Sequence, residues 1–447
     1  MNSTNRRKIL TFLTELSRIL LALVLLLSGL LKGIDPVGGA IKVGEYFTAF
    51  GLTALAPLSL VVSIALCSAE FLLGGLLLMG LWRKFSTLLT LLFMGAMTLL
   101  TLYLAIYNPI SDCGCFGDAV KISNQATFAK NVLFSVPALI LFAGRKRMAP
   151  VSPKRPVLYT LSLMLLFGWG LFVWGNLRHL PVADFRPYKR GASLRSLILR
   201  PDDAPEPVID YKFIYERAGV KDTFDINHIP TTEDWEYVDR IEEVIAKGYE
   251  PPITDFALFD GEEELTERLL RYPGKMIWVT TTHWPTHKGT IAHKLNALAQ
   301  EAKEQGVQFY AIAASEPEEN LRWRETSAAA YPILFADAVT IETMARANPS
   351  VFFLEDGVIL DKINALDIQS ASKVEAQLQK IFGAPANTSD VHLGRWLLLF
   401  LWLVITLVMY FLVVGKEPSP QIESELLPHQ TTPSAPQEES ELTAKQH

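Results

Sequence analysis

Long apolar windows separated by short basic loops constrain this chain more than any other feature of its sequence. A helix needs roughly 20 mainly apolar residues to cross a bilayer. Five windows meet this requirement clearly: residues 11–31, 55–81, 85–107, 157–176 and 395–415. A sixth, 127–144, is shorter and contains Lys130 and Asn131 near its start, and including it lets the loops alternate between the two sides. The sequence therefore predicts a multi-pass α-helical membrane bundle. No A-x-A-like site follows the first window, so we expect it to stay as an anchor.

Basic residues give the orientation of these spans, because loops rich in Lys and Arg stay in the cytoplasm. The basic loops are residues 6–8, 83–84 and 145–155. Both chain ends are then cytoplasmic, and the large segment 178–393 lies in the periplasm of a bacterial inner (cytoplasmic) membrane. The tail 416–447 is rich in Pro, Ser, Gln and Glu and is predicted to be disordered. A net charge of −6 without a concentrated basic face argues against nucleic acid as a partner.

The large outer segment divides into two parts. Residues 178–252 contain many prolines and few regular patterns, so they are predicted to form an irregular connector. Residues 253–383 alternate between strand and helix patterns and end in a hairpin at 349–363, whose turn is "EDG". This order predicts a mixed α/β sheet with crossovers, followed by a terminal hairpin and helix.

The same order resembles a thioredoxin-like domain over residues 253–383, with Pro349 in the place of that fold's cis-proline. In an active member, the first strand runs into W-C-x-x-C, whereas this chain reads "TTTHWPTHKG" at 280–289 and has no cysteine in the domain. We therefore expect no thiol exchange by the domain itself. Trp278, Trp284 and Trp323 are predicted to pack in or near its core. A groove kept near Trp284 would bind an extended peptide, and a purely structural cap is the alternative.

The first four spans, residues 10–147, resemble the DoxX-type and MauE (methylamine-utilisation) family of four-helix membrane proteins. The resemblance is carried by "SRILLALVLLLSGLLKGIDP" (17–36), "AEFLLGG" (69–75) and "DCGCFGD" (112–118). The run "LPVADFRPYKRG" (180–191) is similar to the linker of Bacteroidetes-type members that carry an outer thioredoxin-like domain. The resemblance implies a redox-associated membrane role, linked to methylamine metabolism and to the maturation of disulfide-bearing proteins.

Two of the three cysteines lie side by side in "SDCGCFGD" (111–118). Cys113 and Cys115 are close enough to form a disulfide, and Gly114 tolerates the backbone angles that so small a ring requires. A strained disulfide is more easily reduced, which favours electron exchange over a structural role. Some of the nearby charges would raise the pKa values of the two thiols and others would lower them, so the electrostatics do not decide their reactivity. A static loop-closing disulfide or two idle thiols therefore stay open as alternatives. Cys67, inside the second span, is expected to be a small buried hydrophobe.

Ionisable residues inside the spans are costly and need a reason. Arg18 and Glu70 lie in antiparallel helices, so we expect them to pair as a structural link within the bundle, with a quinone-headgroup or proton-relay contact as the alternative. Lys32 and Asp35 are interpreted as interface residues.

The outer domain contains three histidines that could be considered as metal ligands. Pro285 lies between His283 and His287, and no cysteine ligand is present, so the histidines, with His293, are expected in solvated loops and no metal site is predicted.

Two functional hypotheses follow. In the first, the protein is a membrane thiol-disulfide oxidoreductase. Its Cys113–Cys115 pair exchanges electrons with quinone or another oxidoreductase, and its outer domain presents a periplasmic client. In the second, it is a non-enzymatic membrane scaffold or assembly factor whose cysteines only fasten a loop. The sequence does not decide whether the chain is an enzyme, and quinone is the one cofactor considered. A transporter is a distant third interpretation, since one buried carboxylate without inverted repeats gives it little support.

Overall fold

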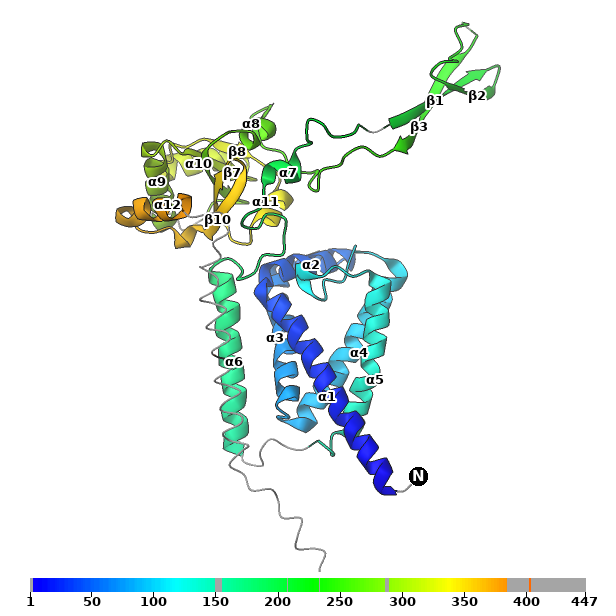
Figure 1. Ribbon diagram of the computed structural model, residues 1–447, viewed down its shortest axis with the longest axis vertical. Coiled ribbons are helices and arrows are strands. Elements are labelled where there is room, and N and C mark those ends of the chain that lie inside the picture. The colour runs from blue at the N-terminus through cyan, green and yellow to red at the C-terminus, as the bar shows by residue number, and fades with distance from the viewer. Residues whose placement is uncertain are drawn as a thin grey trace, which may run out of the picture.

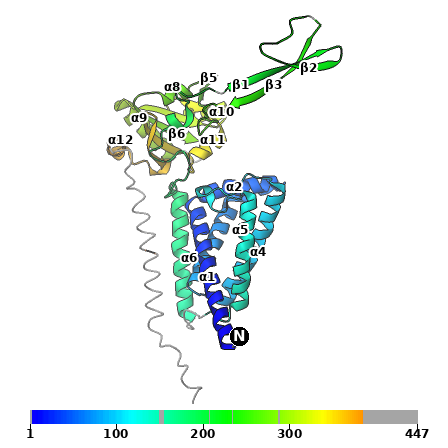
Figure 2. The same cartoon turned by 45° about the vertical axis from the view of Figure 1, so that its right-hand side comes forward.

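The computed structural model describes residues 3–148, 155–206, 208–232, 234–285 and 289–383, together with Trp402. In the views of Figures 1 and 2, a bundle of long helices stands below a globular domain, from which a narrow β arm projects away from the helices. Apart from Trp402, the predicted span 395–415 and the predicted disordered tail 416–447 lie outside the described residues.

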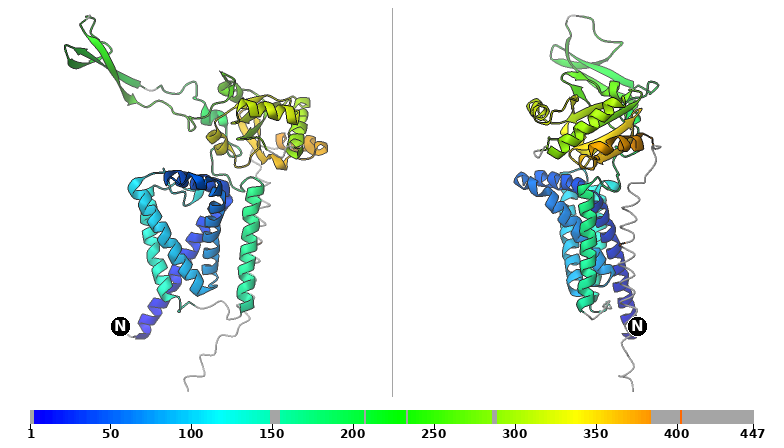
Figure 3. Two further views of the ribbon diagram at one scale, coloured as in Figure 1. Left: turned by 180° about the vertical axis from the view of Figure 1, so that it is seen from behind. Right: turned by 90° about the vertical axis from the view of Figure 1, so that its left-hand side faces the viewer.

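Within the described residues, five helical segments are long and apolar enough to cross a membrane. They are α1 (Ser3–Ile34), η1 with α3 (Thr53–Leu58 and Ser59–Leu78), α4 (Arg83–Tyr107), α5 (Asn124–Gly144) and α6 (Arg155–Arg178). Each overlaps one predicted window, including the short window with Lys130, so the prediction of a bundle of apolar helices is confirmed for them. Helix α1 packs against α3 and α5, and α6 stands beside them (Figure 3).

Helix α2 (Pro36–Ala49) was not predicted, and it lies across the end of the bundle that faces the globular domain (Figure 1). Its start follows from local chemistry. The Asp35 carboxylate accepts a hydrogen bond from the Gly38 amide, and Pro36 occupies the first turn, where no amide donor is needed. At 14 residues the helix is too short to cross a bilayer, so it forms a lid on the bundle instead.

The globular domain contains a seven-stranded mixed sheet in the order β10-β9-β6-β7-β8-β4-β5. Its strands are β4 (Phe259–Asp260), β5 (Glu263–Glu264), β6 (Lys275–Thr281), β7 (Gln308–Ala313), β8 (Ile333–Phe335), β9 (Ser350–Glu355) and β10 (Val358–Asn364). Its helices are α8 (Thr266–Leu270), α9 (Gly289–Glu304), α10 (Pro317–Ser327), α11 (Ala338–Met344) and α12 (Val374–Phe382). Strands β6, β7 and β8 are parallel and β9 is antiparallel to β6, so the predicted mixed sheet with a terminal hairpin is confirmed. The peptide bond between Asn348 and Pro349 is cis.

Both faces of this sheet are buried over strands β6 to β10, because alternate residues of these strands enter or pack against separate apolar clusters. Val279 of β6 enters the cluster that α9 and α12 cover, and Trp278 enters the opposite cluster. The second cluster also contains Tyr188, Leu194 and Ile198, which come from the segment before the domain and its short helix α7 (Leu194–Ile198). The domain therefore begins earlier than the predicted boundary at residue 253.

Residues 208–246 form a three-stranded antiparallel sheet, which we call the arm. Its strands are β1 (Val208–Arg217), β2 (Val220–Asp225) and β3 (Glu236–Ala246), in the order β2-β1-β3. The arm projects from the globular domain on the side away from the bundle (Figure 1). The prediction of an irregular connector over 178–252 is therefore wrong for these residues. The strand "VIDYKFIYER" alternates in polarity, but charged residues and flanking prolines obscured the pattern.

A buried charge cluster fastens the segment after α6 to the globular domain. The Asp184 carboxylate accepts hydrogen bonds from the Arg186 guanidinium and forms an ion pair with Lys362 of β10. Burial and the Arg186 charge lower the pKa of Lys362 to about 8 although Asp184 raises it. Burial raises the pKa of Asp184, but the charges of Lys362 and Arg186 outweigh burial and hold that pKa below its usual 3.8.

Replacing Asp184 with Asn should destabilise the globular domain in a pH-dependent way. At pH 6 the change leaves two buried cations without their carboxylate, and we expect a loss of about 3 kcal/mol in the free energy of unfolding. Because the pKa of Asp184 is lowered on folding, its stabilisation is complete above pH 3.8 and disappears as pH falls through the lowered value. The difference between wild type and variant, measured by urea unfolding of the full chain, should therefore shrink below pH 4. A difference that is the same at pH 6 and pH 3 would contradict this assignment.

Candidate functional site

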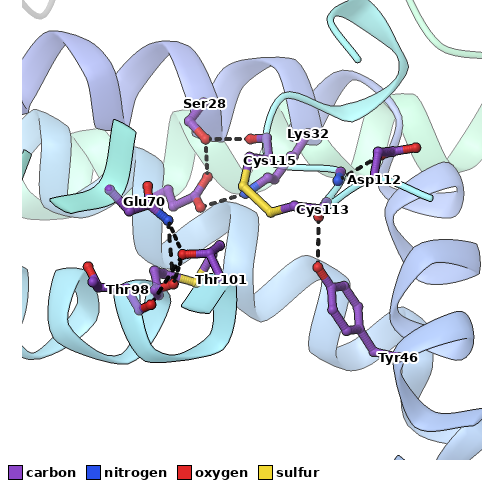
Figure 4. Close-up of a disulfide and its surroundings, with 12 residues drawn as sticks. Ser28, Lys32, Tyr46, Glu70, Thr98, Thr101, Asp112, Cys113 and Cys115 are labelled. Carbon is purple, nitrogen blue, oxygen red and sulfur yellow. Dashed lines mark hydrogen bonds and ion pairs between the residues drawn. A yellow bond between two sulfur atoms is a disulfide. The ribbon is translucent and has the colours of Figure 1, made fainter. Parts of the chain in front are cut away.

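The loop between α4 and α5 carries a disulfide between Cys113 and Cys115, whose Cα atoms lie 5.4 Å apart (Figure 4). Gly114 between them has φ +63°, a left-handed conformation that a residue with a Cβ rarely adopts. Both cysteines are at least nine-tenths buried, in an apolar cluster with Leu104 of α4 and Ile110 of the loop. The predicted pair is thus formed, and it lies inside the end of the bundle.

Three helices supply the hydrogen bonds that let this non-helical loop enter the bundle. Ser28 Oγ of α1 lies 2.8 Å from the carbonyl oxygen of Cys115, and Tyr46 Oη of α2 donates to the carbonyl oxygen of Cys113 at 3.0 Å. Asn124 Nδ2, at the start of α5, donates to the carbonyl oxygen of Ile110 at 2.8 Å. Buried backbone groups cost free energy unless they are paired, so these contacts fix the depth of the loop.

A buried ion pair lies directly beneath the disulfide loop (Figure 4). Lys32 Nζ of α1 is 2.6 Å from Glu70 Oε1 of α3, and the two side chains are 14% and 4% exposed. Ser28 Oγ lies 2.8 Å from Glu70 Oε2 and, as described above, contacts Cys115. One hydroxyl therefore connects the carboxylate of the ion pair with the backbone of the disulfide loop.

This pairing corrects the sequence prediction for Arg18 and Glu70. Arg18 instead pairs with Glu15, one turn earlier in α1, at 2.7 Å. The partner of Glu70 is Lys32, which the sequence placed at the interface. The long lysine side chain extends into the bundle from the end of α1, so the ion pair lies nearer the disulfide than expected. Asp35, also interpreted as an interface residue, pairs with the globular domain.

Charged residues of α2 lie next to Asp112, the loop residue that precedes the disulfide. Lys42 Nζ lies 3.4 Å from Asp112 and 2.8 Å from Glu45. Burial lowers the pKa of Lys42, but the two carboxylates outweigh burial and raise it. Burial, together with Asp112 and Glu45, raises the pKa of Tyr46 well above its usual value, so its phenol stays protonated and donates to the loop.

Arg346 joins the globular domain to the disulfide loop and to the start of α2. It lies between α11 and β9, and its Nε and Nη2 atoms are each 2.8 Å from a carboxylate oxygen, of Asp35 and Asp118 respectively. Its side chain is 9% exposed. Burial would lower the pKa of Arg346, but the two carboxylates raise it above its usual value. A Cβ at Gly38 would lie only 2.9 Å from Nη2, so glycine leaves room for this contact. We call this three-residue contact the Arg346 bridge.

The segment that supplies Arg346 also covers the carboxyl end of the central strand β6. Asn348 Oδ1 accepts from Thr281 Oγ1 at 2.8 Å and from the Thr282 amide at 2.9 Å, and Asn348 Nδ2 donates to the carbonyl oxygen of His283 at 3.0 Å. Trp284 is buried and stacks on Trp323 with ring centroids 4.4 Å apart. The predicted core packing of Trp278, Trp284 and Trp323 is confirmed by their burial.

The remaining candidate residues play no part in this site. Among the described residues, no group of three or more His, Cys, Asp or Glu side chains is arranged to hold a metal ion. His283 and His293 are exposed, and His287 lies outside the described residues. Cys67 is a buried free cysteine whose Sγ lies 3.3 Å from the carbonyl oxygen of Ile64. The sequence did not single out Ser28, Tyr46 or Arg346, because their roles depend on contacts between segments far apart in the chain.

Comparisons with known proteins identify two parts of the chain. Residues 10–144 match the family model described as methylamine utilisation protein MauE, which confirms that part of the resemblance for the bundle. Residues 209–247, the arm, match a domain of unknown function (DUF8463). No curated protein matches the chain. Among solved structures, peroxidoxin BcpB from Mycobacterium tuberculosis is similar at 17% identity and a TM-score of 0.23, covering 30% of this chain and 95% of that chain, which is too weak to support an argument.

Replacing Glu70 with Gln should destabilise the bundle far more than the same change at Glu15. The first change leaves Lys32 without its carboxylate in an apolar surrounding, at a cost of about 3 kcal/mol. The second removes a carboxylate that is 30% exposed and should cost about 1 kcal/mol or less. Thermal unfolding in detergent gives both values. Equal losses of stability in the two variants would show that the Lys32–Glu70 pair stabilises the bundle no more than the partly exposed Arg18–Glu15 pair does.

Removing the Arg346 bridge should expose the disulfide. We expect Arg346→Gln to speed reduction of the Cys113–Cys115 pair by dithiothreitol by roughly tenfold or more, because losing one partner of a desolvated ion pair costs about 2 kcal/mol or more. Arg324→Gln is the control, since Arg324 is an exposed arginine on α10. Thiol trapping over time measures the rate. An unchanged rate for Arg346→Gln would mean that the bridge does not limit access.

Proposed function

We propose that this protein is a redox-associated membrane protein of the MauE type, in which the Cys113–Cys115 pair exchanges electrons with a thiol client on the periplasmic side of a bacterial inner membrane. The observation that carries the proposal is the disulfide itself, which forms within the region that matches the MauE family model. Ser28 connects its loop to a buried ion pair, and Asp118 of the same loop pairs with Arg346 of the globular domain. Within the described residues, these are the cysteines that are placed to react with each other.

The proposed exchange oxidises a client dithiol and reduces the protein. A client thiolate attacks one sulfur of the Cys113–Cys115 disulfide, forms a mixed disulfide and releases the other cysteine as a thiolate. The second client thiolate resolves the mixed disulfide, so the client leaves with a disulfide and the protein keeps two thiols. An isoprenoid quinone in the bilayer is the proposed oxidant that restores the pair, because it accepts two electrons and two protons and leaves as quinol.

In this proposal the globular domain is a thioredoxin-like module without a dithiol of its own. Its strand order, its cis-Pro349 and the position of "TTTHWP" after β6 support the assignment. The strand end that carries a dithiol in active thioredoxins corresponds to the end of β6, and Asn348, two residues from Arg346, covers it. The domain therefore covers the disulfide loop, and the client reaches the pair when this cover shifts.

A membrane scaffold is the second candidate function. The burial of both cysteines favours it, because a disulfide that is covered on all sides can simply hold the loop in place. The globular domain would then bind an assembly partner without chemistry. The two candidates differ in one measurable property, the reduction potential of the pair.

We would measure that potential on purified protein in detergent, with Cys67→Ala as the background and Cys113→Ser as the blank. Thiols are trapped after equilibration in glutathione and dithiothreitol buffers of defined poise. A midpoint between about −120 and −270 mV, the range of catalytic dithiols, is the expected result. A pair that stays oxidised below about −300 mV would reject electron exchange and leave the scaffold.

A further inference from the structure

The two faces of the arm differ sharply in chemistry. Residues that lie opposite each other in neighbouring antiparallel strands project from the same face of the sheet. Phe213 of β1 lies opposite Phe224 on one side and Arg240 on the other, whereas Ile214, the next residue, lies opposite Thr223 and Asp239. The register therefore divides the arm into two surfaces with separate sets of side chains.

One surface, which we call the aromatic face, is mainly apolar. By register and ring contacts it carries Ile209, Tyr211, Phe213, Tyr215, Phe224, Trp235, Tyr237 and Val244. Its rings contact one another, with centroids 5.7 Å apart for Tyr215 and Tyr237 and 5.1 Å apart for Phe224 and Trp235. Within the described residues no other element packs on this surface, and Tyr237 remains 52% exposed. Large uncovered apolar patches on soluble domains mark interaction sites.

Charge separates the two surfaces further. On the aromatic face, Arg217 pairs with Asp234 and Arg240 with Glu242, each at 2.7 Å, and Asp222 adds a third carboxylate, so charges of both signs nearly balance. The opposite surface, which we call the acidic face, carries six carboxylates against two lysines: Asp210, Glu216, Asp225, Glu236, Asp239 and Glu243 against Lys212 and Lys221. A basic partner would be attracted to the acidic face, whereas the nearly balanced aromatic face suits a partner that also carries both signs of charge.

We propose that the aromatic face binds the aromatic face of a second copy of this chain, which makes the protein a dimer through its arms. Both arginines already lie over aromatic rings of the face, with Arg240 5.7 Å from the Tyr211 centroid and Arg217 5.8 Å from the Trp235 centroid. A two-fold axis brings such a face onto its own copy, so that two apolar surfaces with the same mixture of arginines and carboxylates meet. The proposal is independent of the redox function.

Attachment to a membrane favours this pairing. Copies that are anchored by the same apolar helices share one orientation, so their arms project to the same height on the same side. A two-fold axis along the membrane normal preserves that orientation and brings equal faces together. Confinement to one plane also raises the effective concentration of each arm for the other.

The test compares two neighbouring residues of the central strand on opposite faces. In the Cys67→Ala background, Phe213→Cys places a thiol on the aromatic face and Ile214→Cys places one on the acidic face. Membranes that contain each full-length variant are treated with a bis-maleimide. Phe213→Cys should give a covalent dimer, while Ile214→Cys and the background should not. Equal yields for the two positions, or no dimer with Phe213→Cys, would overturn the proposal.

Light scattering of the purified protein in detergent provides a second measurement. The wild type should have the mass of a dimer. Tyr211→Ser with Phe213→Ser should weaken the dimer by at least about tenfold, since aromatic anchors dominate such interfaces. Ile214→Ser with Ile241→Ser, which removes apolar side chains from the acidic face, should leave it intact. A monomeric wild type, or equal weakening by both double variants, would reject pairing through the aromatic face.

Discussion

A non-helical loop can enter an apolar helix bundle only when its backbone groups find hydrogen-bond partners there. The loop between α4 and α5 meets this constraint through Ser28, Tyr46 and Asn124, each from a different helix. Helix α2, the lid, carries Tyr46 over the loop. Ser28 Oγ also lies 2.8 Å from Glu70 Oε2, so the Lys32–Glu70 pair is next to the loop. The position of the disulfide, and therefore any chemistry it performs, depends on this set of contacts.

The loop also determines where the globular domain rests. Asp118 follows the disulfide and Asp35 precedes α2, so the Arg346 bridge contacts both the loop and the start of the helix that covers it. Asn348, close to Arg346 in the chain, holds the turn after β6. One short segment of the domain thus contacts both the end of β6 and the helix bundle. In the redox proposal this segment is the route by which a client would gain access to the pair.

The sequence predicted the parts of the structure that are set by local periodicity. Apolar windows became helices α1 and α3 to α6, and the alternation of strands and helices after residue 253 became the mixed sheet. The partners of charged residues were harder to predict, because they depend on how far neighbouring helices are shifted along their axes and on how far each side chain extends. Arg18 reached Glu15 within its own helix, and Lys32 extended inward to Glu70. The arm was missed because its strands alternate aromatic with charged residues between prolines, which is also typical of irregular segments.

The hydrogen bond between His179 and Asp367 and the hydrogen bond from Asn364 to the Arg178 carbonyl place the globular domain directly on the end of α6. From Arg178 the chain needs only six residues to reach Asp184, which is fixed in the domain. Even fully extended, six residues span only about 20 Å. This short tether means that the domain tilts rather than departs when its contacts with the bundle break. It stays at a high local concentration above the loop, and it closes again at a rate set by intramolecular motion rather than by encounter.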